Sequence, residues 1–250
     1  MDNKKNEVIG QSRHQFIYGY DGEQRTNFLK EIEEENPIVI NGNNPMAVYI
    51  SDYGLPPIEY DKKKVDTGLV TIVSTEYFAF SALSRIIETY SENVKNSEKN
   101  STILELMNNC YCLNLSGIDD LKKVFNDSKT FYKNYYTDYL KNGDTSYSIN
   151  DIKLPFVDLL MYLSQFKKVI NNESYFAFLI DNNKEISIPS TKAINLYVGG
   201  RINDTISMKI ATDPNKWKSY LDCNGQYIQS CHDYGDVQID DSLKKVLKRW

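Results

Sequence analysis

Gly19-Tyr20-Asp21-Gly22-Glu23-Gln24-Arg25-Thr26 is the stretch that decides the fold, because it lies between a predicted strand at 15–18 and a predicted helix that opens at 27–29. At such a junction a phosphate-binding loop uses glycines to turn its amide hydrogens inward, a lysine to neutralise phosphate, and a Ser or Thr to hold Mg²⁺. Gly19, Gly22 and Thr26 are present here. Gln24 replaces the last glycine and Arg25 replaces the lysine. We therefore predict a phosphate loop with altered residues, and the whole stretch supplies the candidate nucleotide-binding residues.

The two replacements bear on nucleotide affinity. Arginine contacts phosphate in a bidentate manner but cannot follow the narrow path of a lysine beneath the loop. Gln24 adds a Cβ atom where the tightest turn favours glycine. Both changes predict weakened binding, and an ordinary strand-turn-helix corner would carry the same residues. Three interpretations therefore stay open: a nucleotide site, a degenerate one, and a structural corner.

Composition limits the classes of protein to which the chain can belong. The 250 residues, of which 41% are hydrophobic, are enough to bury a substantial core. The formal net charge of −5 argues against a domain built mainly to grip a nucleic-acid backbone. The basic cluster at 244–250 is interpreted as a solvated helix face, with DNA binding as the alternative. No apolar run is long enough to cross a bilayer, so we expect a cytoplasmic protein without a membrane partner.

Apolar patterns along the chain predict an α/β fold. Besides the opening strand, short apolar runs predict strands at 38–40, 46–50, 175–180, 206–212 and 236–240, and helical patterns lie at 27–35 and 192–198. Strands that alternate with helices are typical of a parallel sheet with helices on both faces and a ligand crevice at the carboxyl ends of the strands. We predict a single three-layer domain over 1–250, like that of P-loop nucleotidases.

The character of the sequence changes between the two groups of strands. Long helical patterns, as at 77–87 and 156–170, predict a mainly helical insertion over about 76–170. Four of its tyrosines recur at helical intervals, namely Tyr132, Tyr135, Tyr136 and Tyr139. Because no basic residues interleave with them, we expect these rings to pack in the core or against a partner helix rather than to stack on bases.

Polar residues follow the predicted interior strands. Asp181 ends the buried run at 175–180, where a carboxylate can orient Mg²⁺ across from the loop. The next position carries a water-polarising glutamate in hydrolysing nucleotidases, but here it is Asn182, whose amide cannot accept a proton near neutral pH. Glu185 could substitute only if its loop folds inward. We therefore expect slow or absent hydrolysis.

Two further residues complete the predicted site. Thr212 closes the next strand, where it can sense a γ-phosphate, and Arg201 precedes that strand and can complete a phosphate clamp in cis or in a neighbouring subunit. The candidate catalytic residues are thus Asp181, Thr212 and Arg201. The candidate metal ligands are Thr26 and Asp181.

The order of these elements resembles bacterial relatives of the origin-recognition branch of the AAA ATPases. The similarity covers about half of the chain and lies in 19–26, in 178–181 with the polar loop behind it, in the helix at 192–195 with Arg201 behind it, in 206–212, and in 232–240. The resemblance implies ATP with Mg²⁺ as the cofactor. Carried over residue by residue, it assigns Asp181 to organising Mg²⁺ and assigns the phosphate loop to Gly19, Gly22, Arg25 and Thr26.

The resemblance also implies assemblies that act on DNA or regulate partner proteins. We therefore expect a protein partner or a homo-oligomer. A lid and a winged-helix domain would normally follow, so DNA contact is expected through the assembly or through a C-terminal domain beyond residue 250.

Three functions compete at this point. The first is a nucleotide-binding AAA-type ATPase-like domain that acts as a switch or assembly module with weak or absent hydrolysis, so its status as an enzyme stays open. The second is a pseudo-ATPase scaffold without nucleotide, with the helical insertion as its partner surface. The third is direct DNA binding through the tail at 244–250.

Overall fold

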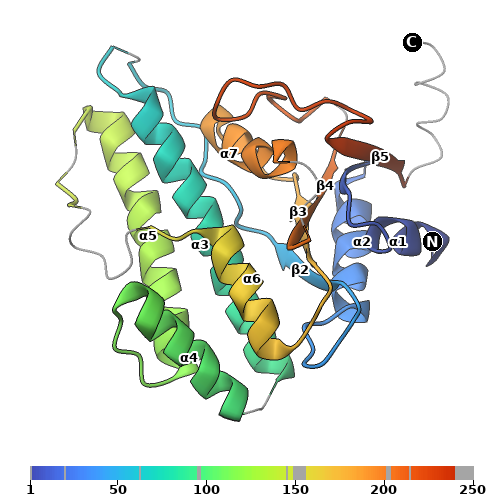
Figure 1. Ribbon diagram of the computed structural model, residues 1–250. Coiled ribbons are helices and arrows are strands. Elements are labelled where there is room, and N and C mark those ends of the chain that lie inside the picture. The colour runs from blue at the N-terminus through green and yellow to red at the C-terminus, as the bar shows by residue number, and fades with distance from the viewer. Residues whose placement is uncertain are drawn as a thin grey trace.

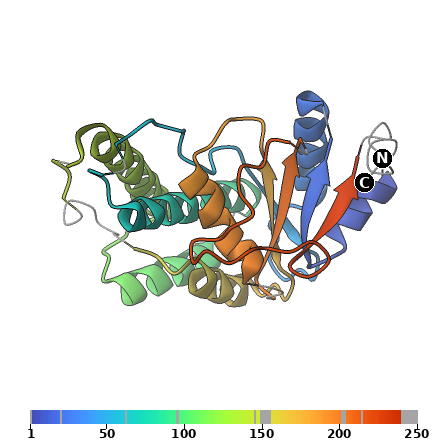
Figure 2. The ribbon, with the colours of Figure 1, turned by 90° about the horizontal axis from the view of Figure 1, so that it is seen from above.

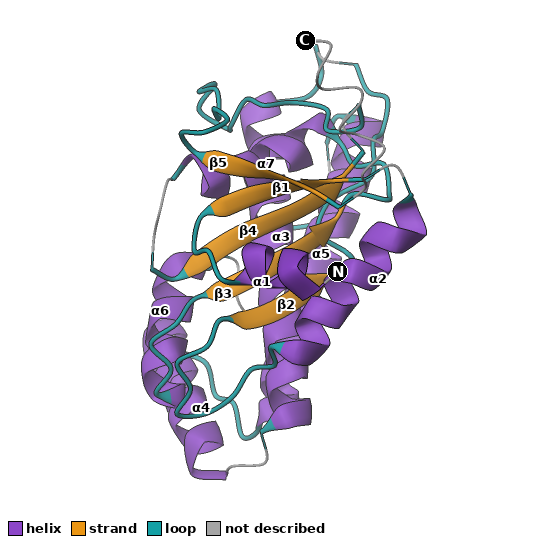
Figure 3. Ribbon diagram, turned by 90° about the vertical axis from the view of Figure 1, so that its right-hand side faces the viewer, coloured by secondary structure: helices purple, strands orange, loops and turns teal. Residues whose placement is uncertain are grey.

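Five parallel strands form the sheet of the computed structural model, which describes residues 2–19, 21–61, 63–94, 97–144, 146–148, 156–200, 204–213 and 215–239. The strands are β1 (His14–Tyr18), β2 (Met46–Ile50), β3 (Phe176–Asp181), β4 (Ile206–Thr212) and β5 (Tyr234–Gln238). Their order across the sheet is β2-β3-β4-β1-β5 (Figure 3). Because every neighbouring pair is parallel, the carboxyl ends of all these strands lie along one edge.

Helices cover both faces of this sheet (Figures 1 and 2). On one face lie α1 (Asp2–Ile9) and α2 (Gly22–Glu35). The other face carries α3 (Thr67–Asn93) and α7 (Ile188–Gly199), and beyond them α4 (Ser97–Tyr111), α5 (Ile118–Asn142) and α6 (Leu159–Ile170). The predicted three-layer α/β fold of the P-loop nucleotidase type, with a parallel sheet between helices, is confirmed.

Alternating side chains of the interior strands divide the core between the two faces. Leu179 of β3 packs in one cluster with Phe28 and Leu29 of α2. Its neighbour Phe178 points to the opposite face, as successive strand residues do, and its ring lies 6.3 Å from that of Phe78 in α3. Burial on both faces explains why β3 reads as an uninterrupted apolar run.

The helical block α3–α6 begins at Thr67, earlier than the expected position near 76. Its α3 and α5 pack together, and the ring of Tyr132 stacks 5.8 Å from that of Phe80. Tyr132 and Tyr136 are 1% and 2% exposed and lie in the core as expected, whereas Tyr135 and Tyr139 are partly buried and pack against it. The expectation that no apolar run is long enough to cross a bilayer is wrong by length and composition, because α3 is long and apolar enough. However, 72% of its most apolar window is buried inside the fold, which is typical of a core helix.

The predicted strand at 38–40 is wrong, because this segment forms a loop and turn. Pro37 precedes it and has no N–H to donate to a ladder. Asn41 then takes a left-handed backbone conformation, with φ of 55°, and its amide donates to the carbonyl of Ile170 at 2.9 Å. Ile38 is fully buried, so the apolar pattern reflects an anchored loop rather than a strand.

Candidate functional site

The loop after β1 is short, because α2 already begins at Gly22. Asp21 is the N-cap of this helix, and its Oδ1 accepts from the amides of Glu23 at 2.9 Å and Gln24 at 3.2 Å. A phosphate at a helix N-terminus uses such amides. The carboxylate of Asp21 therefore takes the position of an anion at the start of α2. Tyr20, also a predicted loop residue, lies outside the described residues.

Arg25 is folded into the protein rather than toward an open cradle. It is 1% exposed, and its guanidinium donates to the carbonyl of Gly19 and to Oδ1 of Asn183. Its Nε is buried and has no hydrogen-bond partner among the described residues. The side chain predicted to contact phosphate is thus engaged by acceptors of the chain itself.

Thr26 and Asp181 lie together, as a shared magnesium site would require. The hydroxyl of Thr26 contacts Oδ2 of Asp181 and lies 3.0 Å from the carbonyl of Gly22. Asp181 is 5% exposed, and its burial raises the pKa of the carboxyl, although contacts with Thr26, Arg25 and Tyr49 oppose that shift. Its Oδ1 is buried without a hydrogen-bond partner in the described part of the chain. The metal-binding role of this pair stays a prediction.

Asn183 connects the loop to the end of β3, and the sequence reasoning missed it. Its Nδ2 lies 2.7 Å from the hydroxyl of Thr26, 2.8 Å from Oδ2 of Asp181 and 3.0 Å from the carbonyl of Gly22. A Cβ atom on Gly22 would come within 2.9 Å of Oδ1 of Asn183, so a side chain at this position would displace the end of the Asn183 side chain. We call Asp21, Arg25 and Asn183 the loop latch, because together they fill the loop with the chain's own polar groups.

Asn182 is held on both sides of its amide. It is 4% exposed, its Oδ1 accepts from the hydroxyl of Tyr53 at 3.0 Å, and its Nδ2 donates to the hydroxyl of Thr212 at 2.9 Å. Thr212 in turn donates to the carbonyl of Asp213 at 3.0 Å. The predicted sensor position is therefore beside the loop, since the carbonyl of Thr212 also accepts from the amide of Gly19 at 3.3 Å.

Of the remaining predicted residues, only Glu185 lies within the described part of the chain. Glu185 is exposed and forms an ion pair with Lys218, which lowers the pKa of its carboxyl, so its loop does not fold it inward. Arg201, predicted as part of a phosphate clamp, lies outside the described residues.

These residues are therefore arranged to suit Mg²⁺ but not the phosphates of ATP. Thr26 and Asp181 are arranged as a magnesium pair would be. The phosphates of ATP do not fit this conformation, because Asp21 already accepts from the amides of Glu23 and Gln24. Asn183 accepts from Arg25 and also takes the space beside Gly22. Within the described part of the chain, no three His, Cys, Asp or Glu side chains gather in a way that could hold a metal ion. A metal here would depend on one carboxylate.

Comparison with known proteins places the chain in a family. The family model ORC-CDC6-like matches residues 47–248, which covers β2 to β5 and the helical block but not the loop after β1. No curated protein and no solved structure gave a significant match. The predicted resemblance to the origin-recognition branch is confirmed by this match. The chain belongs to the ORC-CDC6-like family.

Proposed function

We propose that this chain is an AAA-type ATPase-like module that does not hydrolyse ATP and works through contacts with other proteins. Membership of the ORC-CDC6-like family supports the first part, since the family suggests an ATPase-like module. The absence of hydrolysis is supported by the position of Asn182 at the end of β3, where both sides of its amide are in hydrogen bonds.

Hydrolysis needs a group that can take a proton from the attacking water. An amide cannot do so, and Asn182 is also fixed by Tyr53 and Thr212 in a buried setting. Glu185, the nearest alternative along the chain, is paired with Lys218. The loop latch adds a second obstacle, because the amides of Glu23 and Gln24 already have an acceptor.

Phosphate release from Mg²⁺-ATP tests this proposal. The wild-type chain should release no more phosphate than buffer does, and an active ATPase of similar size is the positive control. Turnover by the wild type that is lost in Asp181→Ala, but kept in the exposed-site control Asn215→Ala, would overturn the proposal.

A nucleotide-dependent switch with weak binding is the second candidate, and one observation favours it. Asp181 and Arg25 each keep a buried polar atom without a partner among the described residues, and Thr26 lies beside them. A cation near the carboxylate and an anion near the guanidinium would relieve both. If this candidate holds, Asn183→Ala should bind Mg²⁺-ATP more tightly than the wild type in titration calorimetry, because it opens the loop latch.

The setting that we propose for the module is an oligomeric, DNA-associated assembly in the cytoplasm of a bacterium. Family membership supports the assembly in general terms. Sedimentation of the chain alone and with duplex DNA tests this setting, and a chain that stays monomeric and DNA-free at all concentrations would argue against it.

A further inference from the structure

Three open cavities follow one another along the carboxyl edge of the sheet. The first, of about 360 Å³, lies between the loops after β3 and β4, and the second, of about 220 Å³, lies between the loops after β2 and β3. The third, of about 80 Å³, lies between the end of β2 and α3. Neighbouring cavities share lining residues, which are Lys184, Glu185 and Ile186 for the first two and Ser51 and Asp52 for the last two. We call these three adjacent cavities the carboxyl-edge trough.

Basic side chains outnumber acidic ones in the carboxyl-edge trough, although the whole chain carries a net charge of −5. The basic ones are Arg85, Lys129, Lys133, Lys184, Lys216 and Lys218, and the acidic ones are Asp52, Glu88 and Glu185.

Each carboxylate of the trough already has a cation. Glu185 pairs with Lys218, Lys129 lies 3.7 Å from Asp52, and Arg85 lies 3.7 Å from Glu88. No ion pair is formed within the described part of the chain by Lys133, Lys184 or Lys216, all of which are exposed. The first two cavities therefore present ammonium groups with no carboxylate left to neutralise them.

The third cavity adds a neutral donor. The hydroxyl of Ser84, which lines this cavity, is 3% exposed and has no hydrogen-bond partner among the described residues. Buried hydroxyls normally have a partner. Arg85 already pairs with Glu33 and Glu88, and Lys129 with Asp52, so a neutral backbone carbonyl of a bound segment, rather than a carboxylate, would supply an acceptor for this hydroxyl.

The shape and the aromatic residues of the trough restrict the kind of anion. The cavities extend across the ends of three strands, which suits an extended chain better than a small molecule. Single-stranded nucleic acid binds in basic grooves by stacking bases on exposed rings. Three of the rings that line the trough are too buried for that, because Tyr53, Tyr77 and Trp217 are 1%, 1% and 6% exposed. The fourth, Tyr49, is half-buried, and its hydroxyl lies 3.3 Å from Oδ2 of Asp181.

We propose that the carboxyl-edge trough binds an extended acidic peptide segment of a partner protein. Carboxylates of the segment pair with Lys133, Lys184 and Lys216, and a backbone carbonyl of the segment at the α3 end accepts from Ser84. This inference rests on the proposed function, since it names the chemistry of a contact through which the module would assemble. It assigns the contact to the strand ends together with the sides of α3 and α5 that face them.

Fluorescence anisotropy of the full chain with a fluorescein-labelled oligoglutamate peptide tests this proposal. Saturable binding should weaken as salt is added, because exposed charges are screened. The double variant Lys184→Ala/Lys216→Ala should bind the peptide roughly tenfold more weakly, since each lost pair is exposed. Lys184→Arg/Lys216→Arg keeps both charges and should bind nearly as the wild type does.

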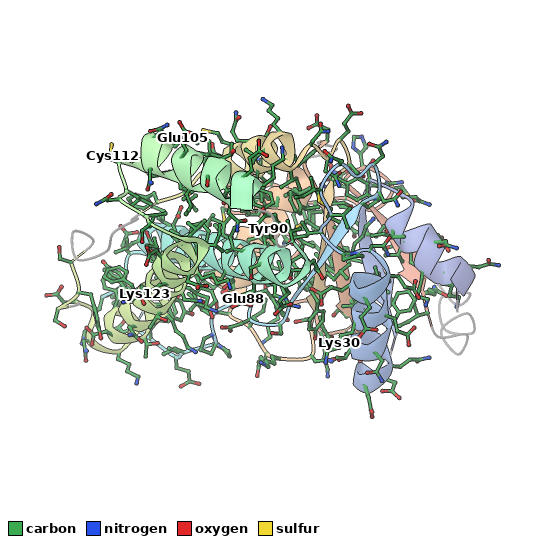
Figure 4. All side chains as sticks on the ribbon, turned by 90° about the horizontal axis from the view of Figure 1, so that it is seen from below. Lys30, Glu88, Tyr90, Glu105, Cys112 and Lys123 are labelled. Atoms are coloured by element: carbon green, nitrogen blue, oxygen red, sulfur yellow. The ribbon has the colours of Figure 1, made fainter. Side chains whose placement is uncertain are left out.

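The matched control removes two lysines outside the trough. Lys123, which projects from α5 in Figure 4, and Lys168 of α6 are both exposed and line none of the three cavities. Lys123→Ala/Lys168→Ala should leave peptide binding unchanged. An equal loss in both double variants, or no binding by the wild type, would overturn the proposal. Equally tight binding of an oligothymidylate of the same charge, lost in the trough variant, would also overturn it in favour of nucleic acid.

The same samples separate this inference from the proposed function. Absent peptide binding together with absent phosphate release overturns only the trough assignment. Phosphate release from Mg²⁺-ATP overturns the non-hydrolysing module, whatever the peptide does.

Discussion

Replacing Asn183 with alanine should destabilise the protein by about 2 kcal/mol. The side chain contacts two buried charged groups, Asp181 and Arg25, and also the loop residues Gly22 and Thr26. A hydrogen bond to a charged group contributes about 1.5–3 kcal/mol, and the exposed position of Asn183 lets water replace part of what is lost. Urea unfolding followed by circular dichroism measures the change as a lower midpoint with the same slope.

The pH dependence of this loss is a second feature of the same prediction. Burial already raises the pKa of Asp181, and removal of the Nδ2 donor raises it further in the folded state. A carboxyl whose folded pKa is raised loses stability as the pH rises through that value, so the deficit of Asn183→Ala should be larger near neutral pH than in mild acid. Asn215→Ala is the control, because within the described part of the chain Asn215 is bonded through its backbone amide and not through its side chain, and it should change stability by less than about 0.5 kcal/mol. Equal losses of stability in Asn183→Ala and Asn215→Ala would show that the hydrogen bonds of the loop latch do not stabilise the protein.

Three further predictions follow from single contacts. Asp21→Ala should cost about 1 kcal/mol in urea unfolding, because the helix α2 loses its N-cap. Lys209→Met should cost about 2–4 kcal/mol by the same assay, because Nζ of Lys209 donates at 2.6–2.8 Å to two backbone carbonyls and to Gln15. Burial raises the pKa of Glu76 to about 7 from its ordinary value of 4.5, so wild-type stability should fall as the pH rises from 4.5 past 7. In Glu76→Gln that slope should be flatter and the stability at alkaline pH higher by about 2 kcal/mol, whereas an unchanged slope would contradict the assignment to Glu76.

Much of the fold could be predicted because the sheet lies between two layers of helices. Burial on both faces makes β3 and β4 uninterrupted apolar runs, and such runs are visible in a single sequence. The strand ends then placed Asp181 and Thr212 at the same edge as the loop, since parallel strands share the direction of their carboxyl ends. The segment at 38–40 failed because three apolar residues in an anchored loop look like a short strand.

The state of the loop could not be predicted from residue types alone. The sequence shows that Arg25 replaces a lysine, but its inward direction depends on an acceptor from Asn183, which is distant along the chain. The capping role of Asp21 did have a sequence signal, because an Asp just before a helix is a common N-cap. With Asp21 as the N-cap, α2 begins at Gly22 and the loop after β1 is short. Gly19 and Gly22 favour the interpretation as a phosphate loop instead, so the capping role of Asp21 was not predicted.

Titration calorimetry of Mg²⁺-ATP into the wild-type chain shows whether the chain's own side chains close the loop after β1. We expect no saturable heat at millimolar nucleotide, with the folded state verified by circular dichroism on the same sample. Saturable heat in the wild type that disappears in both Arg25→Ala and Asp181→Ala would instead show an open nucleotide site.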